Sequence, residues 1–205
     1  VGADDNASGV AALLEAAEAL ALARPARSIL ICAFSGEEDG LLGSRALAKA
    51  LPMPQTAIVA MLNLDMVGVP WAVNALGDDS LVPALERWQA AGEAARRLAK
   101  GVENINWVGS DHTPYQLAGV RALTFNGPIP RESVRHYHDM ADTIDKVSPQ
   151  LIDDSAAVIV DGVRALAADE TLQAERRSPS ETEKLFTRFG LEKRMKAMGL
   201  WAFGP

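Results

Sequence analysis

Hydrophobic residues fall into two recurring patterns along the 205-residue chain, helical spacing and short apolar runs. Apolar positions three or four residues apart are typical of helices that bury one face. This spacing predicts helices over about Ala7–Leu22, Leu41–Leu51, Leu81–Lys100 and Ser148–Ala168. Asn6 is placed to cap the first helix and Arg24-Pro25 to end it, while Gly101 is expected to end the third. Ser148-Pro149 is a typical start for the last.

Nearly continuous apolar runs lie between these helices and predict strands that are buried on both faces. The runs cover Ser28–Phe34, Ala57–Leu64, Asn104–Val108 and Val120–Asn126. Strands that alternate with helices are typical of α/β proteins. We therefore expect an α/β fold, a three-layer sandwich with a mostly parallel central sheet flanked by helices.

The last part of the chain differs from the rest. Residues from Asp169 to Glu183 are rich in charge, and an amphipathic helical pattern follows. We expect a body at 1–168 and a tail at 169–205 that packs back on this body. The alternative is an arm for a partner or for self-association, with Trp201 and Phe203 as its anchors.

Composition narrows the class of protein. Hydrophobic residues make up 48% and charged residues 23%, as in ordinary soluble domains. The net charge of −7 has the wrong sign for a surface that binds nucleic acid or anionic lipid. No apolar run approaches the roughly 18 residues of a membrane span, so we expect no transmembrane segment. The single cysteine, Cys32, excludes disulfide frameworks and cysteine-rich zinc motifs, and we expect it to pack in the core.

Acidic and histidine side chains follow the predicted strands at the point where each strand ends. Ligands of open α/β sheets bind beyond the carboxyl ends of the strands, so these side chains are expected to converge there. They are Glu37 and Glu38 after the first run, Asp65 after the second, Asp111 and His112 after the third, and His138 after the fourth. Asp5 joins them from the start of the first helix.

Crowded carboxylates repel one another, and a cation resolves that repulsion. Aspartate, glutamate and histidine without cysteine suit Zn²⁺, Mn²⁺ or Co²⁺, whereas an all-oxygen set would suit Mg²⁺ or Ca²⁺. Several carboxylates with histidine indicate a two-metal site bridged by one aspartate. Glu37 and Glu38 are adjacent and point in different directions, so one can bind metal while the other acts as a base. Taken alone, each of these acids would be a solvated turn or a helix cap.

Four segments, in order, resemble the co-catalytic di-zinc aminopeptidases of clan MH, which include bacterial leucyl aminopeptidases. The first is Gly2-Ala3-Asp4-Asp5-Asn6-Ala7-Ser8-Gly9-Val10, similar to the bridging-aspartate motif. The others are Phe34-Ser35-Gly36-Glu37-Glu38 with Gly40-Leu41-Leu42-Gly43-Ser44, Asn63-Leu64-Asp65-Met66-Val67-Gly68, and Ser110-Asp111-His112 through Tyr137-His138 to Asp142-Thr143. The resemblance runs from Val1 to about Val147 and implies a zinc peptidase catalytic domain at 1–168.

Carried over by position, the resemblance implies that Asp5 bridges two zinc ions. Glu38 and His138 would complete one ion, and Asp65 would help to hold the other. Glu37 would be the general base in peptide hydrolysis by metal-activated water.

Other residues of the matching segments have weaker expected roles. Asp111 and His112 stand where the family places substrate-pocket or outer groups around the metals. Asp142 and Thr143 are expected to organise the loop after His138 and not to touch metal. His136 receives no role from the resemblance.

The chain departs from the family pattern at its beginning. Members carry a His-x-Asp segment upstream of the bridging aspartate, and no residues precede Val1 here. We therefore expect a fragment that lacks the first strands of the sheet, with unequal metal sites and little or no activity. The ion held by Asp5, Glu38 and His138 is expected to survive better than the ion that shares Asp65.

The leading interpretation is an aminopeptidase that acts on peptides. A carboxypeptidase or dipeptidase of the same fold, a glutaminyl cyclase, and a non-catalytic domain like the transferrin receptor stay as alternatives. Retention of Glu37 argues against the receptor, because a receptor needs no base. The resemblance favours an exported or periplasmic bacterial protein.

Overall fold

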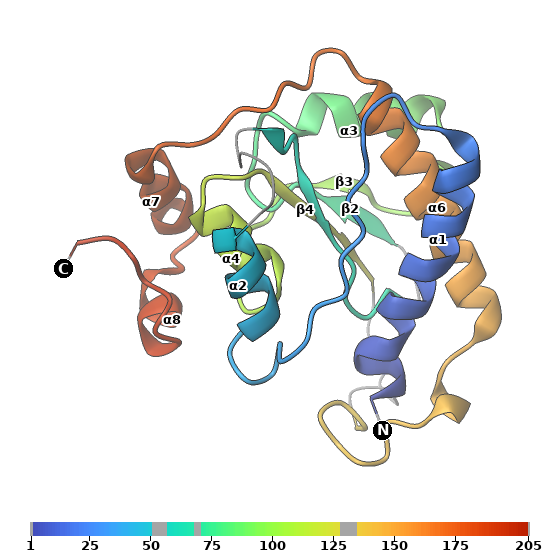
Figure 1. Ribbon diagram of the computed structural model, residues 1–205, viewed down its shortest axis with the longest axis horizontal. Helices are drawn as coiled ribbons and strands as arrows, with labels where there is room; N and C mark the ends of the chain where they lie inside the picture. Colours follow the sequence, from blue (N-terminus) through green and yellow to red (C-terminus); the bar gives the residue numbers. More distant parts are fainter. Residues whose placement is uncertain (1, 51–56, 68–70, 128–134, 205) are drawn as a thin grey trace.

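The computed structural model describes residues 2–50, 57–67, 71–127 and 135–204 (Figure 1). Its helices are α1 (Gly9–Ala23), α2 (Leu42–Ala50), α3 (Val82–Ala91), α4 (His112–Leu117), α6 (Pro149–Ala168), α7 (Pro179–Arg188) and α8 (Glu192–Ala197). Short helical turns lie at η1 (Ala3–Ser8), η3 (Ala94–Arg97) and η4 (Ile144–Lys146). The strands are β1 (Met61–Asn63), β2 (Ala72–Asn74), β3 (Gly101–Glu103) and β4 (Ala122–Asn126).

The four strands form one mixed sheet in the order β1-β4-β2-β3. β1 runs parallel to β4 with Met61 opposite Ala122, and β2 runs parallel to β3. β2 and β4 are antiparallel, with Ala72 opposite Asn126. Two of these three pairings are parallel, and helices flank the sheet, so the expected α/β class with a central sheet is confirmed.

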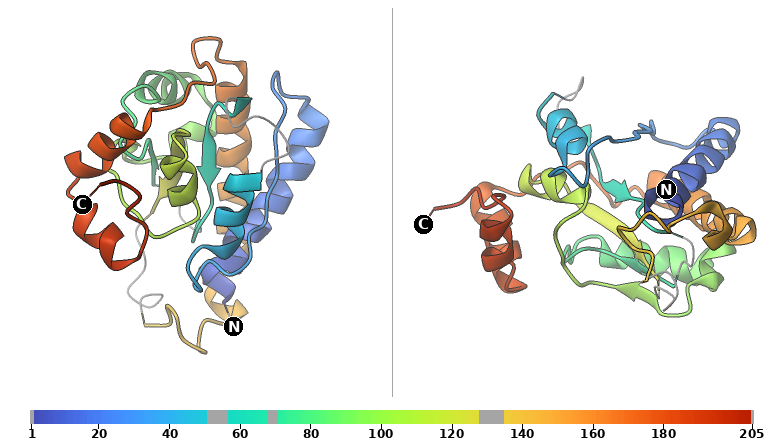
Figure 2. Two further views of the ribbon diagram at one scale, coloured as in Figure 1. Left: turned by 60° about the vertical axis from the view of Figure 1, so that its left-hand side comes forward. Right: turned by 90° about the horizontal axis from the view of Figure 1, so that it is seen from below.

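Alternate residues of β4 serve the two faces of the sheet, as the pleat of a strand requires. Leu123 and Phe125 enter the main core with Trp88 of α3 and with residues of α1 and α6, which lie side by side (Figure 1). A second cluster brings α2 and α4 together through Ala48 and Tyr115. The tail helices α7 and α8 lie at the opposite end of the molecule from α1 and α6 (Figure 2).

The strand expected over Ser28–Phe34 is wrong as a buried strand. The segment pairs with no other strand in the part of the chain that the structure describes. Leu30 is 52% exposed and Ile31 is 40% exposed. An apolar run indicates a preference for burial, but a strand also needs a neighbouring backbone to bond, and composition does not supply one. The strand expected over Ala57–Leu64 is present but limited to β1.

The helix expected over Leu81–Lys100 is interrupted at Gly92, where the backbone is extended. Asp161 of α6 explains the interruption, because its carboxylate accepts hydrogen bonds from the indole of Trp88 (3.1 Å) and from the N–H of Ala94 (3.1 Å). A side chain at residue 92 would collide with these groups.

Two details of the next segment were also predicted wrongly. Gly101 does not cap a helix but begins β3, and the strand expected over Asn104–Val108 is wrong, because those five residues follow β3 without regular structure. The pattern of apolar runs did not predict β2, which has only three residues.

The helix expected from Ser148-Pro149 to Ala168 is present as α6. Beyond it, Ser178 and Glu181 form a reciprocal capping box that starts α7. Phe186, Met195 and Leu200 of the tail are buried against Val108 and Leu41 of the body. The division of the chain into domains at residue 168 stays a prediction.

One stretch, Ala3–Ala23, has the length and the mean hydropathy (1.2) of a membrane-spanning helix. The sequence itself predicted no transmembrane segment, because no apolar run was long enough. α1, which forms most of this stretch, packs against α6.

Candidate metal centre

Asp5 lies in η1, and its backbone is held by a residue far along the chain. The carboxylate of Asp142, which is 4% exposed, accepts hydrogen bonds from the N–H of Asp4 (2.9 Å) and of Asp5 (3.0 Å). Asp142 stands four residues after His138, so it joins the Asp5 turn to the His138 loop. This agrees with its expected role as an organising residue.

Asn6 joins the same turn to a second loop. Its side-chain amide donates to the carbonyl of Leu64 (3.0 Å) and accepts from the N–H of Met66 (3.1 Å), so it binds the backbone on both sides of Asp65. The same oxygen accepts from the N–H of Gly9 (3.1 Å), near the start of α1. The sequence predicted only that Asn6 caps the first helix, because the order of apolar and polar residues does not show which loop lies opposite Asn6.

The extended segment that follows α1 ends in a tight turn, which contains Glu37 and Glu38 and leads into α2. The carbonyl of Glu37 accepts from the N–H of Gly40 (3.0 Å) and of Leu41 (2.8 Å). Gly36 has a φ of +69°, a conformation that glycine adopts without strain. The Leu41 side chain is buried among tail residues. The turn is therefore fixed at its backbone and on one side by packing.

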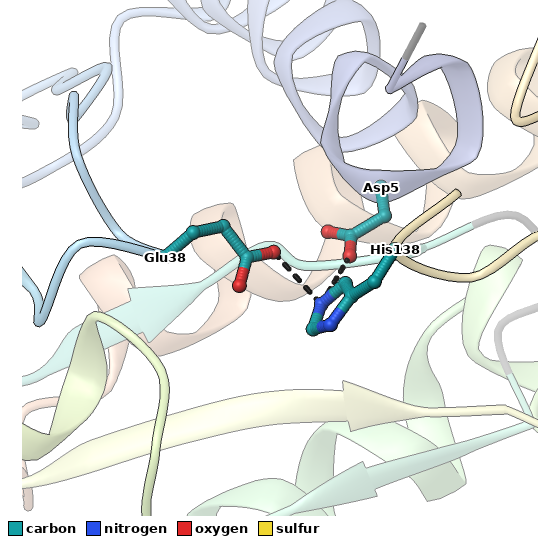
Figure 3. A group of neighbouring side chains, drawn as sticks. All are labelled: Asp5, Glu38 and His138. Carbon is teal, nitrogen blue, oxygen red and sulfur yellow. Dashed lines mark ion pairs between the residues drawn. The ribbon is translucent and has the colours of Figure 1, made fainter. Parts of the chain in front are cut away.

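His138 completes a cluster with two of the predicted ligands (Figure 3). Its Nε2 lies 2.8 Å from Oε1 of Glu38 and 3.2 Å from Oδ2 of Asp5. One ligand atom from each of the three residues lies within 4.8 Å of the other two. The ring of Tyr137 stacks on the His138 ring with 3.8 Å between ring centroids. The structure thus brings together three of the four predicted metal ligands as one group.

Asp65, the fourth predicted ligand, lies close enough for its charge to raise the pKa of Asp5 and of Glu37. Ser110 donates to its Oδ2 (2.7 Å) and accepts in turn from the amide of Asn63 (2.9 Å). Burial raises the pKa of Asp65, and the Ser110 hydrogen bond opposes that rise. Ser110 is a further site residue that sequence reasoning quoted only as part of a motif.

The carboxylates of the centre are costly to ionise together. Burial, together with the charges of Asp65 and Glu38, raises the pKa of Asp5 to about 6. Burial also raises the pKa of Glu37 to about 7, with Glu38 and Asp65 acting in the same direction. A divalent cation between these groups would favour their charged forms. Two carboxylates and an imidazole fit zinc by the chemistry of the donor set.

The weaker predictions have mixed outcomes. Asp111 lies beside the centre, where its charge contributes to the raised pKa of Glu37. His112 does not join the centre: it is fully buried, with Nε2 2.9 Å from the carbonyl of Trp107 and its ring edge-on to that indole. His112 therefore has the surroundings of a core side chain, and its expected role as a substrate-pocket or outer group of the metal centre stays a prediction. Cys32, expected in the core, is only half-buried and lies in none of the three core clusters, because the Ser28–Phe34 segment is not a buried strand.

The described residues thus combine a mixed sheet with a cluster of two carboxylates and one imidazole. The chain belongs to Peptidase family M28, which matches residues 1–163 and confirms the resemblance drawn from the motifs. A probable zinc metalloprotease from Leptosphaeria maculans is 33% identical over 67% of this chain and 39% of its own length. Aminopeptidase YwaD from Bacillus subtilis is 30% identical over 79% of this chain and 37% of its own length.

Solved structures give the same result for the fold. An aminopeptidase from Aneurinibacillus sp. strain AM-1 superposes with a TM-score of 0.64 at 28% identity, over 86% of this chain and 42% of that one. A zinc aminopeptidase from Bacillus subtilis superposes with a TM-score of 0.62 at 24% identity, over 84% of this chain and 44% of that one. The chain thus spans less than half the length of these relatives.

Proposed function

We propose that this chain carries the catalytic centre of a zinc-dependent exopeptidase that removes N-terminal residues from peptides. The observation that carries the proposal is the convergence of Asp5, Glu38 and His138 on one point, with Glu37 next in sequence to one of them. The relatives are named aminopeptidases and zinc metalloproteases. Those names favour an aminopeptidase over a carboxypeptidase, a glutaminyl cyclase or a receptor-like domain.

Asp5, Glu38 and His138 would hold one zinc ion, and Asp5 with Asp65 would hold a second. Zinc at such a site lowers the pKa of a water molecule to about 7 and polarises a carbonyl group. We infer that the two positions are unequal, because His138 belongs to the first and no histidine of the described residues lies with Asp65 in a group of ligand atoms.

Glu37 would be the general base. Its carboxylate is free of the three-residue cluster, so it is available to take up and return a proton beside the metal. The turn fixes the backbone from which this carboxylate extends, and the carboxylate would receive a proton from water and deliver it to the leaving amine. Asp111, close by, would keep the affinity of Glu37 for that proton high.

Zinc binding tests the ligand assignment on this chain directly. His138→Ala and Glu38→Gln should each weaken zinc binding about 100-fold or more, because each removes a ligand of the same ion. The matched controls His136→Ala and Asp39→Asn should bind zinc as the unaltered chain does. Equal zinc affinity in Glu38→Gln and Asp39→Asn would remove Glu38 from the site.

Hydrolysis tests the activity in the complete gene product. Glu37→Gln should retain zinc and lose hydrolysis of an unblocked peptide by about 100-fold or more, the size of a general-base contribution. An N-acetylated copy of that peptide should resist the unaltered enzyme. Cleavage of the acetylated peptide from its carboxyl end would replace the aminopeptidase by a carboxypeptidase.

A further inference from the structure

A pocket of ≈ 440 Å³ lies where the tail meets the body, apart from the metal centre. One wall is the turn Gly77–Ser80 after β2, and the other runs from Glu175 through α7 to Arg188. In Figure 1 the chain leaves α6, crosses over the body and reaches α7 on the far side. None of the lining residues belongs to the metal centre. We call it the Arg176 pocket.

Close contacts hold the two walls together. Gly77 allows α7 to approach, since a Cβ at this residue would lie 2.7 Å from Cδ1 of Leu185. The N–H of Arg177 donates to the carbonyl of Gly119 (3.0 Å). Arg121, which is only 7% exposed, donates to the carbonyl of Gln173 (2.5 Å). The pocket is therefore a fixed feature of the join between tail and body.

The acidic side chains of the walls already have partners. The pairs are Asp78 with Arg177, Asp79 with Arg188, Glu175 with Arg121, and Glu181 with the backbone N–H of Ser178. Five cationic residues line the pocket, including Arg176 and Lys184, against these four acids. The balance of charge in the pocket is positive.

Three guanidinium nitrogens in these walls are buried and have no acceptor among the described residues. They are Nε and Nη2 of Arg176 and Nη1 of Arg177. Nε and Nη2 form one edge of the guanidinium plane, the edge that binds two oxygens of a carboxylate or phosphate at once. Buried donors without acceptors are rare because they are costly, and an absent anion is one of their ordinary explanations.

The electrostatics of Arg177 agree with an absent anion. Burial lowers the pKa of its guanidinium, the charge of Asp78 opposes this, and the nearby Arg121 adds to the lowering. Asp78 is shared between both arginines, so one carboxylate faces two cations. A further negative charge would stabilise this group.

We propose that the Arg176 pocket binds a phosphate group, for which Arg176 and Arg177 would supply the three donors that lack acceptors. A carboxylate has two oxygens, which the Arg176 edge alone would occupy, whereas a phosphate monoester presents three. Lys184, at the exposed rim, adds a further cation. The volume of ≈ 440 Å³ exceeds that of a phosphate ion, so the pocket has room for a small organic group attached to it.

The pocket lies between the part of the chain that matches the family and the tail. One wall lies within residues 1–163, which match the family, and the other lies beyond them. A bound phosphate group would join the two walls and stabilise the tail on the body.

Calorimetric titration of the chain, treated with chelator so that no metal binds phosphate, tests this proposal. The probes are inorganic phosphate, glycerol phosphate and acetate. Arg176→Gln should weaken phosphate binding by about 10-fold or more, since it removes a bidentate, charge-assisted contact. Lys184→Gln, at an exposed position that tolerates substitution, should weaken it less. Arg96→Gln makes the same change of charge at an exposed site outside the pocket and should leave affinity unchanged.

The proposal is supported if both phosphate probes bind more tightly than acetate. If glycerol phosphate binds more tightly than inorganic phosphate, a phosphate monoester is the better fit. Acetate binding as tightly as phosphate would overturn it. So would phosphate binding that is absent, or equal in the Arg176→Gln, Lys184→Gln and Arg96→Gln variants. Thermal unfolding of each variant without ligand shows that it is folded. If Arg176→Gln fails to fold, Lys184→Gln against Arg96→Gln decides the question.

Discussion

The most informative single substitution outside the metal ligands is Asp142→Asn. The Asp142 carboxylate accepts two backbone N–H groups, from Asp4 and Asp5, and it is nearly fully buried. An asparagine of the same shape has one acceptor oxygen and turns an N–H₂ group toward the other donor. The change therefore removes one charged hydrogen bond and leaves one buried N–H without an acceptor.

The size of the effect follows from those two contacts. A hydrogen bond to a charged group contributes about 1.5–3 kcal/mol, and a buried donor left unpaired costs about 1–3 kcal/mol. We expect Asp142→Asn to lower the free energy of unfolding by about 3 kcal/mol. Since the contacts orient Asp5 toward the His138 loop, zinc binding should also weaken, by about 10–100-fold, as for other residues that orient ligands.

Two assays measure these effects separately. Urea unfolding of the zinc-free chain gives the loss of stability, and competition with a chromophoric chelator gives zinc affinity under conditions where the variant is folded. Asp145→Asn, an exposed aspartate of the same loop, is the control and should change zinc affinity little. Zinc affinity in Asp142→Asn equal to that of the control would refute the orienting role of Asp142.

Two further predictions concern the core. Burial lowers the pKa of His112 from its usual 6.5 to about 4, so the unfolded chain takes up a proton over this range before the folded chain does. The contribution of His112 should therefore lower the free energy of unfolding by about 3 kcal/mol as the pH drops from 6.5 to 4. Urea unfolding of the unaltered chain and of His112→Gln at pH 7 and 4.5 measures this contribution. The same loss of stability in both proteins would contradict the prediction. Gly92→Ala places a Cβ 2.6 Å from the Asp161 carboxylate and should lower the free energy of unfolding by about 1–3 kcal/mol, measured by thermal unfolding. The control Gly204→Ala has open space around the new Cβ and should change stability little. Similar unfolding temperatures for the two variants would show that the contact at residue 92 is not strained.

Local sequence signals predicted three of the long helices, α1, α2 and α6, and the motif residues of the site. Ser148-Pro149 set the start of α6 because the cap and the proline act within a few residues. The motifs placed Asp5, Glu38 and His138 together because each follows a recognisable segment of a known family. These signals are carried by neighbouring residues, which a sequence shows directly.

Contacts between distant residues were not predictable in the same way. Asp142 binds the backbone of Asp5 across 137 positions, and Asn6 binds the loop of Asp65 across about 60. His112 lies among predicted ligands in sequence but turns into the core toward Trp107. The Ser28–Phe34 run has the composition of a strand, yet strand formation depends on a partner backbone. Each of these outcomes is decided by what lies opposite in space.

The proposed function depends on zinc held by Asp5, Glu38 and His138 beside Glu37. A crystal of the zinc-loaded chain, with anomalous diffraction recorded on both sides of the zinc absorption edge, tests it most directly. We expect a strong anomalous peak within about 2.0–2.2 Å of a carboxylate oxygen of Asp5, of a carboxylate oxygen of Glu38 and of Nε2 of His138. A zinc peak bound elsewhere, with no peak between these three side chains, would contradict it.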